Sequence, residues 1–439
     1  MSVNPADSPV FGTLYGSDAM RAVFEDTALL GRMLEVEAAL ARVQGRLAII
    51  PAEAAAAISA AARPAVLDLA ALAADIRKAG TPVPGLTKAL AAAAGEAGRF
   101  VHWGATTQDI IDTAVVLQIR DGLALFRADL LATITALADQ ADRHRGTVMA
   151  GRTFLQHALP ITFGLKCAVW LQPLIADVER LDQLRPRIER VQLGGAVGTL
   201  ASLGADGLAV MEALAAELRL AAPPAPWHAA RDGMAEAAGV LGILCGTLAK
   251  IGTDIGLLAQ TDVGEVLEPQ EEGRGGSSTL PHKRNPIAAV YLVAACRAVH
   301  ALVPVMLGAM ATDHERGTGP WQSECLALPQ CFVLGHGALL HARTIAEGLE
   351  VHPERMRANL DRTQGLIMTE AVSMALAPSL GRGAAHRVVK HAADTALARH
   401  IHLQAALAGE AEVSARLDPA AIARLTDPAS YLGSTDAFI

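Results

Sequence analysis

One long helical pattern limits what this chain can fold into more than any other feature of its sequence. It runs from about Asp109 to His144, and its apolar residues keep the spacing of a helix bundle: Val116, Ile119, Leu123, Phe126, Leu130 and Leu137. Thr133 fills the one gap in that series. At 1.5 Å per residue, such a helix is roughly 50 Å long. The sequence therefore predicts a bundle of long helices.

Four further ranges have the same apolar, helical character: 161–184, 235–263, 287–312 and 323–349. The range 287–312 is the most apolar and resembles a membrane span, but Arg297, His300 and Pro304 interrupt it. A helix that is apolar on all sides needs protein around it. The pattern therefore favours buried helices in a large bundle, with oligomerisation through that bundle.

The composition favours an all-α fold. Hydrophobic residues make up 52% of the chain and aromatic residues only 3%, so Ala, Leu and Val must build the core, which suits close-packed helices better than a β-sandwich. From about Ala19 to Pro51 a packed seam predicts helix, and shorter helices should follow. The length of 439 residues suits two or three domains. We expect an N-terminal helical domain at 1–108, a central helical bundle at 109–352 and a small C-terminal helical domain at 353–439.

Charge and cysteine content limit the partners and the compartment. The net charge of −8, from 45 acidic and 37 basic residues, argues against nucleic acid as a partner but not against an anionic substrate. Five cysteines without Cys-x-x-Cys spacing favour a reduced protein with buried thiols over a disulfide framework or a zinc site. The segment Met1–Asp7 lacks the features of a secretion signal, so we expect a cytoplasmic protein without a membrane partner. We expect neither a metal nor another cofactor, because no ligand spacing for one is present.

The chemistry of the chain is concentrated in the segment Gly273–Pro286. Three glycines precede two hydroxyls, an ammonium and an amide, which come from Ser277, Ser278, Lys283 and Asn285. A glycine-rich loop can bring backbone N–H groups close to an anion, and these side chains suit carboxylate chemistry. Composition alone fits a surface linker equally well. A phosphate-binding P-loop is excluded, because that motif requires Gly before its Lys and Ser or Thr after it, and here the neighbours are His282 and Arg284.

With this loop counted as the first polar cluster, three others each lie next to a predicted long helix. The second is at His102–Asp109, the third at Gly151–Pro160 and the fourth at His314–Trp321. In the second cluster, Thr106, Thr107 and Asp109 could simply cap the helix that follows. Capping is compatible with binding an anion, since a helix N-terminus is itself an anion site. The glycines at 194–198 are not expected to bind a dinucleotide, because no strand pattern precedes them.

The loop resembles the signature of the fumarase/aspartase superfamily, Gly-Ser-Ser-x-x-Pro-x-Lys-x-Asn-Pro, with every fixed position filled. The other three clusters correspond to stretches of that superfamily in the same order, so the resemblance covers most of the chain. It implies a three-domain fold with a central long-helix bundle, assembled as a homotetramer whose active sites each take residues from three subunits. It also implies that Ser277 removes a proton from carbon next to a carboxylate while Lys283 and Asn285 hold the substrate. Whether Ser277 or Ser278 carries the proton stays open.

The same resemblance implies substrate-binding residues in the other clusters. Carboxylate binding would fall to Thr106, Thr107, Gln108, Thr153 and Gln156, with the weakest correspondence at Gln108. His102 and Arg316 are candidates for a further carboxylate of a tricarboxylate substrate. A hydrogen bond at the helix start explains His102 equally well, and a surface ion pair explains Arg316 equally well. We interpret His157 and His282 as structural.

Within the superfamily, these clusters are most similar to the cycloisomerase branch, whose members interconvert a carboxymuconate and its lactone. One departure bears on mechanism: most lyases of the family carry His after the Thr of the third cluster, and here the residue is Phe154. Opening a lactone expels a carboxylate, which can leave unprotonated at neutral pH. Such an enzyme can therefore dispense with a positioned acid. The expected partner is a small polycarboxylate.

Three alternatives stay open. Adenylosuccinate lyase shares the Ser-Ser-Thr-x-Pro-His-Lys-Arg-Asn-Pro wording, but it normally keeps the third-cluster His and needs cationic groups for a nucleotide phosphate, which Gly317–Gln322 does not offer. A related lyase acting on another carboxylate fits the same residues. A non-catalytic structural relative, such as a lens crystallin, is disfavoured by the intact Ser277, Lys283 and Asn285.

Overall fold

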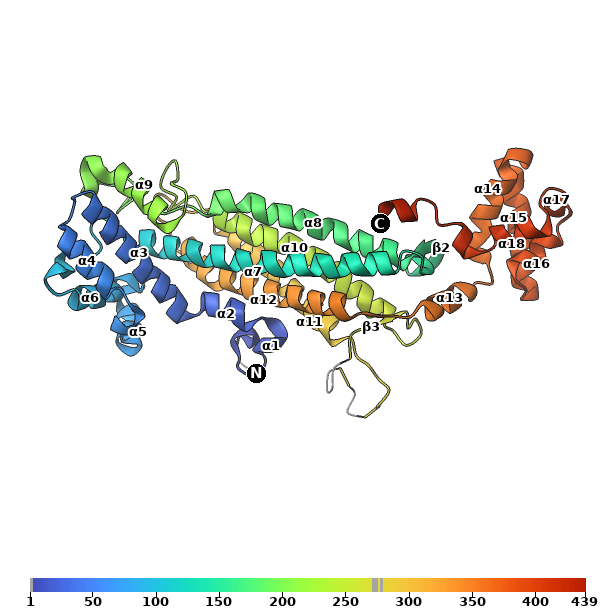
Figure 1. Ribbon diagram of the computed structural model, residues 1–439, viewed down its shortest axis with the longest axis horizontal. Coiled ribbons are helices and arrows are strands. Elements are labelled where there is room, and N and C mark those ends of the chain that lie inside the picture. Colours follow the sequence, from blue (N-terminus) through green and yellow to red (C-terminus); the bar gives the residue numbers. More distant parts are fainter. Residues whose placement is uncertain (1–2, 271–274, 277–278) are drawn as a thin grey trace. The chain divides into compact units, whose positions relative to one another are not determined.

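The computed structural model describes residues 3–270, 275–276 and 279–439 (Figure 1). The chain divides into two compact units. Unit 1 comprises Met1–Leu131, Ala176–Ala249 and Tyr291–His341, and unit 2 comprises Ala132–Ile175, Lys250–Val290 and Ala342–Ile439. Five long helices contribute residues to both units: α7 (Thr107–Arg143), α8 (Phe163–Ile188), α10 (Asp232–Leu258), α11 (Ile287–Gly308) and α12 (Pro320–Gly348).

These five helices confirm the predicted long helices, with ends shifted by a few residues. The apolar positions that predicted α7 are all at most 2% exposed: Val116, Ile119, Leu123, Phe126, Leu130 and Leu137. Within unit 1, Phe126 of α7 packs edge-on against Phe332 of α12, with ring centroids 5.9 Å apart. Further along the chain, α10, α11 and α12 each bury a cysteine, at Cys245, Cys296 and Cys331. The long helices therefore carry much of the core.

Unit 1 also holds the shorter helices of the N-terminal region. α3 (Asp26–Arg46) packs against α4 (Ala52–Ala61) and α9 (Gly207–Leu218). The predicted seam on α3 is buried at Met33, Val36, Leu40 and Val43. The remaining short helices of this region are α1 (Gly12–Tyr15), α2 (Asp18–Phe24), α5 (Leu69–Ala79) and α6 (Val83–Ala93).

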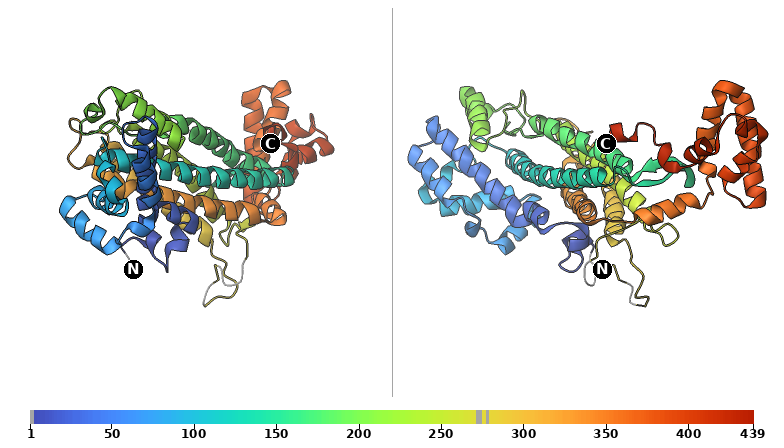
Figure 2. Two further views of the ribbon diagram at one scale, coloured as in Figure 1. Left: turned by 60° about the vertical axis from the view of Figure 1, so that its left-hand side comes forward. Right: turned by 45° about the vertical axis from the view of Figure 1, so that its right-hand side comes forward.

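Unit 2 contains two small sheets that the sequence did not predict. β1 (Val148–Thr153) and β2 (Gln156–Thr162) form an antiparallel hairpin, which lies next to the end of α7 in Figure 1 and in the right-hand view of Figure 2. β3 (Val266–Leu267) pairs antiparallel with β4 (Glu350–Val351). Both sheets are short, so the fold remains all-α in class.

The C-terminal helices of unit 2 form their own hydrophobic core. Its buried members include Val372, Leu376, Val389, Leu403 and Leu407. Gly381, with φ of 75°, makes the tight turn between α14 and α15, a conformation that favours glycine. The helices here are α13 (Pro353–Asp361), α14 (Thr369–Leu380), α15 (Arg382–Arg399), α16 (Leu403–Ala408), α17 (Ala411–Ser414) and α18 (Pro419–Leu425). The division into domains at 108 and 352 stays a prediction.

Two sequence expectations need correction. The helix expected from Ala19 to Pro51 is interrupted at Glu25, whose backbone is extended with ψ of 156°. A helical period does not detect a single extended residue, so the pattern joined α2 to α3. The thiols were expected to be buried, and four of the five are, but Cys325 is exposed.

Among the residues that the structure describes, three helices are long and apolar enough to cross a membrane by length and composition: α10, α11 and α12. In α11, only 28% of the most apolar stretch is buried within the chain. Val290, Val305 and Leu307 are among its exposed side chains.

Candidate active site

The structure describes residues 275–276 and 279–286 of the signature loop. Ser277 and Ser278, the predicted proton carriers, lie outside the described residues. At the base of the loop, Gly276 and Arg284 form an antiparallel bridge. Asn285 donates to the carbonyl oxygen of Gly275 through its backbone nitrogen, at 3.0 Å, and through its side-chain amide, at 3.1 Å. Residues 275–276 and 284–285 are therefore tied together.

Two carboxylates hold this loop base in unit 2. Arg284 donates from both terminal nitrogens to Glu350, at 2.8 and 2.7 Å, and also to the carbonyl of Glu268. The hydrogen bond to Arg284 lowers the pKa of Glu350 below its ordinary value. The Glu268 side chain accepts from the N–H groups of Ala288 and Ala289 and so caps the start of α11. Lys283 is left exposed, with its ammonium available to an anion.

The hairpin between β1 and β2 carries the third polar cluster at its tip. Thr153 pairs with Gln156, so Phe154 and Leu155 are the two turn residues. Their φ values of 50° and 63° place both in the left-handed region, where turns of this type normally use Asn or Gly. The exposed fractions are 99% for Phe154 and 69% for Leu155. The predicted binding residues Thr153 and Gln156 are also exposed, so this tip offers its functional groups outward.

A buried carboxylate anchors the same hairpin next to its tip. Glu265 is fully buried and accepts from both terminal nitrogens of Arg152, at 2.9 and 2.6 Å. Asn359 of α13 donates to Glu265 at 2.8 Å. His157, on the opposite strand, has a pKa lowered by burial and then by the charge of Arg152, which fits the structural role expected for it. Arg152 lies directly before Thr153 and therefore fixes where the tip begins.

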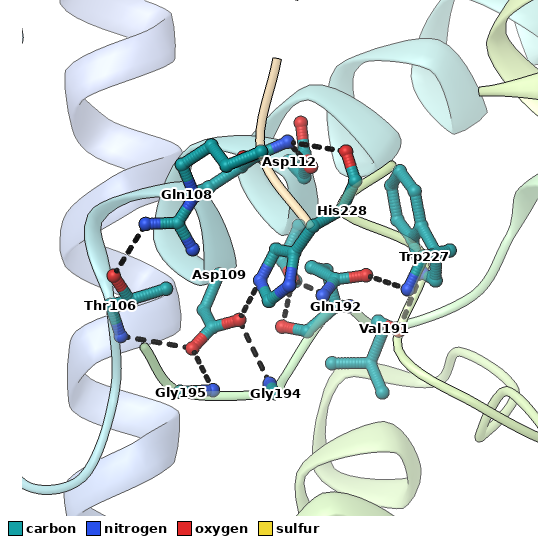
Figure 3. Close-up of polar contacts among 12 residues, drawn as sticks. Thr106, Gln108, Asp109, Asp112, Val191, Gln192, Gly194, Gly195, Trp227 and His228 are labelled. Atoms are coloured by element: carbon teal, nitrogen blue, oxygen red, sulfur yellow. Dashed lines mark hydrogen bonds and ion pairs between the residues drawn. The ribbon is translucent and has the colours of Figure 1, made fainter. Parts of the chain in front are cut away.

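In unit 1, the start of α7 is organised around the buried carboxylate of Asp109 (Figure 3). Its Oδ2 accepts from the N–H groups of Thr106, at 2.9 Å, and Gly195, at 3.0 Å. Its Oδ1 accepts from the N–H of Gly194, at 2.9 Å, and lies 2.7 Å from Nε2 of His228. The backbone N–H groups at 194–195 therefore bind a side-chain carboxylate of the same chain. The contact with Thr106 is the capping contact expected at this helix start.

A second buried network lies one turn further along α7. Arg231 donates to both oxygens of Asp112, at 2.8 and 3.0 Å, and to both oxygens of Glu324, at 2.8 and 2.5 Å. Trp321, in the fourth polar cluster, donates its indole N–H to Asp112 at 3.0 Å. Burial raises the pKa of Glu324, and Arg231 opposes that rise. These contacts tie the starts of α7, α10 and α12 together.

The predicted binding residues of unit 1 differ in accessibility. Arg316 donates to the Thr106 hydroxyl at 3.3 Å, so the structure brings the second and fourth clusters together. Thr107 is partly exposed at the first position of α7. Gln108 is buried and donates instead to Asp112 and to the carbonyl of His228, which points its amide nitrogen away from solvent. Nδ1 of His102 lies 2.6 Å from Oε1 of the Glu37 carboxylate.

Several residues of this region were not identified from the sequence. Glu37 contacts His102, which is 65 residues away. Glu265 contacts Arg152 across 113 residues, and Arg231 contacts Asp112 across 119. The only available signal was a charged residue within an apolar pattern, as at Glu37 in the seam of α3. Among the described residues, no group of three or more His, Cys, Asp or Glu side chains is placed to hold a metal ion.

Comparison with known proteins agrees with this arrangement. A model of the family described as Lyase matches residues 15–300, and one described as adenylosuccinate lyase C-terminus matches 365–439. A 3-carboxy-cis,cis-muconate cycloisomerase of Pseudomonas aeruginosa is 48% identical, covering 100% of this chain and 96% of that protein. A nitrosuccinate lyase of Streptomyces davaonensis is 41% identical, covering 99% and 94% respectively.

The fold agrees as well. The crystal structure of the 3-carboxy-cis,cis-muconate lactonizing enzyme from Pseudomonas putida superimposes with a TM-score of 0.95 at 46% identity, over 98% of this chain and 97% of that one. The sequence match extends over the whole chain, and the polar clusters occur in the expected order along an all-α fold. This chain belongs to the fumarase/aspartase superfamily.

Proposed function

We propose that the chain interconverts 3-carboxy-cis,cis-muconate and 4-carboxymuconolactone, a step of the protocatechuate branch of the β-ketoadipate pathway. The observation that carries this proposal is the 48% identity to a cycloisomerase of that substrate over the full chain. The signature loop supports it, because an exposed Lys283 in a loop whose sequence also carries two serines suits a substrate rich in carboxylates.

The proposed chemistry is a proton transfer coupled to the breaking of a C–O bond. From lactone to muconate, Ser277 takes the proton from the carbon next to a carboxylate. The electrons of that C–H bond pass through an enolate into the new C=C bond, the ring C–O bond breaks, and the ring oxygen leaves as a carboxylate. In reverse, that carboxylate adds across the double bond and Ser277 returns the proton. Ser278 is the alternative proton carrier.

Stabilising the enolate is the main demand on the site. Removing the proton adds a negative charge next to a carboxylate that is already charged. Lys283 and Asn285 are the proposed donors to this charge, and loss of one such donor typically lowers the rate by about 10²–10³. The tie between Asn285 and Gly275 supports the role, since donors fixed in advance stabilise a developing charge best.

The exposed phenyl ring at the hairpin tip fits a reaction that needs no acid at that position. A departing carboxylate is stable unprotonated at neutral pH, whereas hydroxide or an amine requires a proton donor. Phe154 cannot donate a proton, and its side chain is 99% exposed rather than buried in its own unit. We infer that the tip completes the site of another copy of the chain.

We further propose that the protein is a cytoplasmic homotetramer with active sites shared between subunits. The exposed apolar side chains of α11 support assembly, because such a surface is costly in water. The five free cysteines support a reducing compartment. Sedimentation of the purified protein tests the tetramer directly.

A second candidate function is adenylosuccinate lyase activity. The observation that favours it is the match of residues 365–439 to the C-terminal region of that enzyme. Phe154 argues against it, because expelling an amine requires an acid. We therefore rank it below the cycloisomerase.

One assay tests the proposal. Purified protein is mixed with 3-carboxy-cis,cis-muconate, and in parallel with adenylosuccinate, while the absorbance of each substrate is followed. We expect loss of the muconate absorbance only. Turnover of adenylosuccinate alone, or of neither compound, contradicts the proposal.

Variants of the loop then test the mechanism. Ser277→Ala should abolish turnover without weakening substrate binding, while Ser278→Ala identifies the serine that carries the proton. His282→Gln is the matched control, because His282 is an exposed loop residue interpreted as structural. If Ser277→Ala keeps full activity, the assignment of the base is wrong.

A further inference from the structure

Glu37 is a charged residue in the core of unit 1. It lies near the middle of α3, on the helix face that also carries Met33 and Leu40, and only 1% of it is exposed. The spacing of 4 and 3 residues between these three positions is that of a packed seam. An apolar residue at position 37 would continue that seam, so packing alone does not require a carboxylate here.

The partner of Glu37 is a predicted substrate-binding residue. Oε1 of Glu37 lies 2.6 Å from Nδ1 of His102, a distance typical of a strong, charge-assisted hydrogen bond. His102 has φ of 60°, a left-handed conformation that is strained for a residue with a Cβ atom. Strain of this kind persists where surrounding contacts fix it, and it is concentrated at functional sites.

A second polar residue on the same face holds the next residue of the chain. Gln44, two turns after Glu37, donates to the carbonyl of Trp103 at 2.7 Å. Glu37 and Gln44 together therefore fix the 102–103 segment onto α3. The segment leads directly into Thr106, whose N–H is bound by Asp109 and whose hydroxyl accepts from Arg316. His102 is in this way attached to the same short stretch as the other predicted carboxylate ligands of unit 1.

Keeping this carboxylate buried is energetically unfavourable. Among the described residues, Oε2 of Glu37 has no hydrogen-bond partner. A buried acceptor left without a partner costs about 1–3 kcal/mol, and more when it is charged. Gln44, two turns away on the same face, also leaves one oxygen without a partner, Oε1, but a neutral amide costs less to bury than a carboxylate. A charged residue at position 37 is therefore explained by what it does to His102.

We propose that Glu37 is a positioning residue that orients His102 and keeps its imidazole protonated, so that Nε2 is presented to a carboxylate of the substrate. The proposal rests on the proposed function to the extent that the substrate is a polycarboxylate. A protonated imidazole donates from both nitrogens. With Nδ1 directed to Glu37, Nε2 is the nitrogen that reaches the ligand.

The electrostatics of the pair agree with this role. Burial lowers the pKa of His102, but the hydrogen bond and charge of Glu37, followed by the charge of Asp109, outweigh it and raise the pKa above the ordinary value. Glu37 and Asp109 are the charged groups that act on the ring from the described elements packed against it. Both are acidic and buried, so both favour the imidazolium.

The test measures binding of tricarballylate, a compound with three carboxylates, by titration calorimetry from pH 6 to pH 9, alongside kcat/KM for 3-carboxymuconate. In the unaltered protein, affinity should fall as pH rises through the pKa of His102. Glu37→Gln should raise Kd by about 10- to 100-fold at neutral pH, the loss expected for a hydrogen bond to a charged group. It should also move the fall in affinity to lower pH. Glu37→Asp, which keeps the charge, should restore much of both.

Two further variants separate positioning from stability. Gln44→Leu removes the matched contact from the same buried face; it should lower the melting temperature without moving the pH dependence. His102→Asn should weaken binding about as much as Glu37→Gln does, and adding Glu37→Gln to His102→Asn should cause no further loss.

The outcomes are distinct. If Glu37→Gln binds tricarballylate with unchanged Kd and unchanged pH dependence, or if its effect adds to that of His102→Asn, Glu37 is merely structural and the inference fails while the proposed function stands. If the unaltered protein neither binds tricarballylate nor turns over 3-carboxymuconate, the proposed function fails and the role of Glu37 fails with it.

Discussion

The start of α7 and the tip of the β1–β2 hairpin both carry predicted carboxylate ligands, but they are held in opposite ways. Around Thr106, buried groups on several elements converge on one carboxylate, that of Asp109. At the hairpin, the buried anchor Glu265 binds Arg152 just before the tip, and the tip itself is exposed with two strained residues, Phe154 and Leu155.

This difference separates a preorganised surface from one that needs a partner. The cluster in unit 1 has its backbone donors already paired within the chain, so binding a substrate there requires little further ordering. The hairpin tip leaves an aromatic ring and two polar ligands in solvent, which suits a segment that inserts into another copy. The predictions below test each half of this contrast.

The largest effect is expected from Asp109→Asn. The amide keeps the shape but loses the charge, and its NH₂ group faces N–H donors of Thr106, Gly194 or Gly195. Breaking a buried charged network of this kind costs about 3–5 kcal/mol, and kcat/KM should fall by at least about tenfold because Thr106 is released. Thermal unfolding at fixed protein concentration and steady-state kinetics measure both. The control Asp142→Asn, on the exposed far end of α7, should stay within about 0.5 kcal/mol.

A smaller loss is expected from Glu265→Gln, the anchor of the hairpin. The substitution removes the charge that Arg152 and Asn359 share, which should cost about 2–3 kcal/mol. Because the tip lies directly beyond Arg152, kcat should fall more than the affinity for substrate in unit 1. Equal losses in kcat and in binding would show that the anchor affects the whole fold rather than the tip.

The helical parts of this contrast were predictable, while the contacts that hold the site were not. α7 was predicted within two residues at its start, at Asp109 against Thr107, because its apolar spacing is long and regular. The hairpin was missed because its turn is Phe154–Leu155, without the Asn or Gly that signals such turns. The proposed contact of the tip with another copy of the chain accounts for these two turn residues instead.

The buried carboxylates show a second limit of sequence reasoning. Asp109 was noticed as a possible helix cap, which accounts for its contact with Thr106 but not for those with Gly194 and His228. Those partners are 85 and 119 residues away, and no local pattern connects them. Motif resemblance located the clusters, and only the fold shows which groups hold each cluster in place.

A still smaller effect on stability is expected when the strained turn is replaced. In a Phe154→Asn, Leu155→Gly double variant, the turn gains residues that accept left-handed φ, which relieves about 1–2 kcal/mol per residue. Lost contacts with another copy should offset much of that gain, so the melting temperature should change little while kcat/KM falls about tenfold. A clear rise in melting temperature with full activity would mean that the tip has no partner.

The smallest effect is expected at the loop base, where Arg284 and Glu350 are both partly exposed. Because the pKa of Glu350 is lowered in the folded protein, the pair stabilises the protein above the ordinary pKa near 4.5, and this contribution is lost as pH falls through the lowered value. Solvent screening limits it to about 1 kcal/mol or less. Glu350→Gln should therefore lower the melting temperature slightly at pH 7 and not at pH 3, and added salt should shrink the difference. An equal loss at both pH values would indicate that Glu350 acts by packing against the loop base, and the ion pair would then not be what ties the loop to β4.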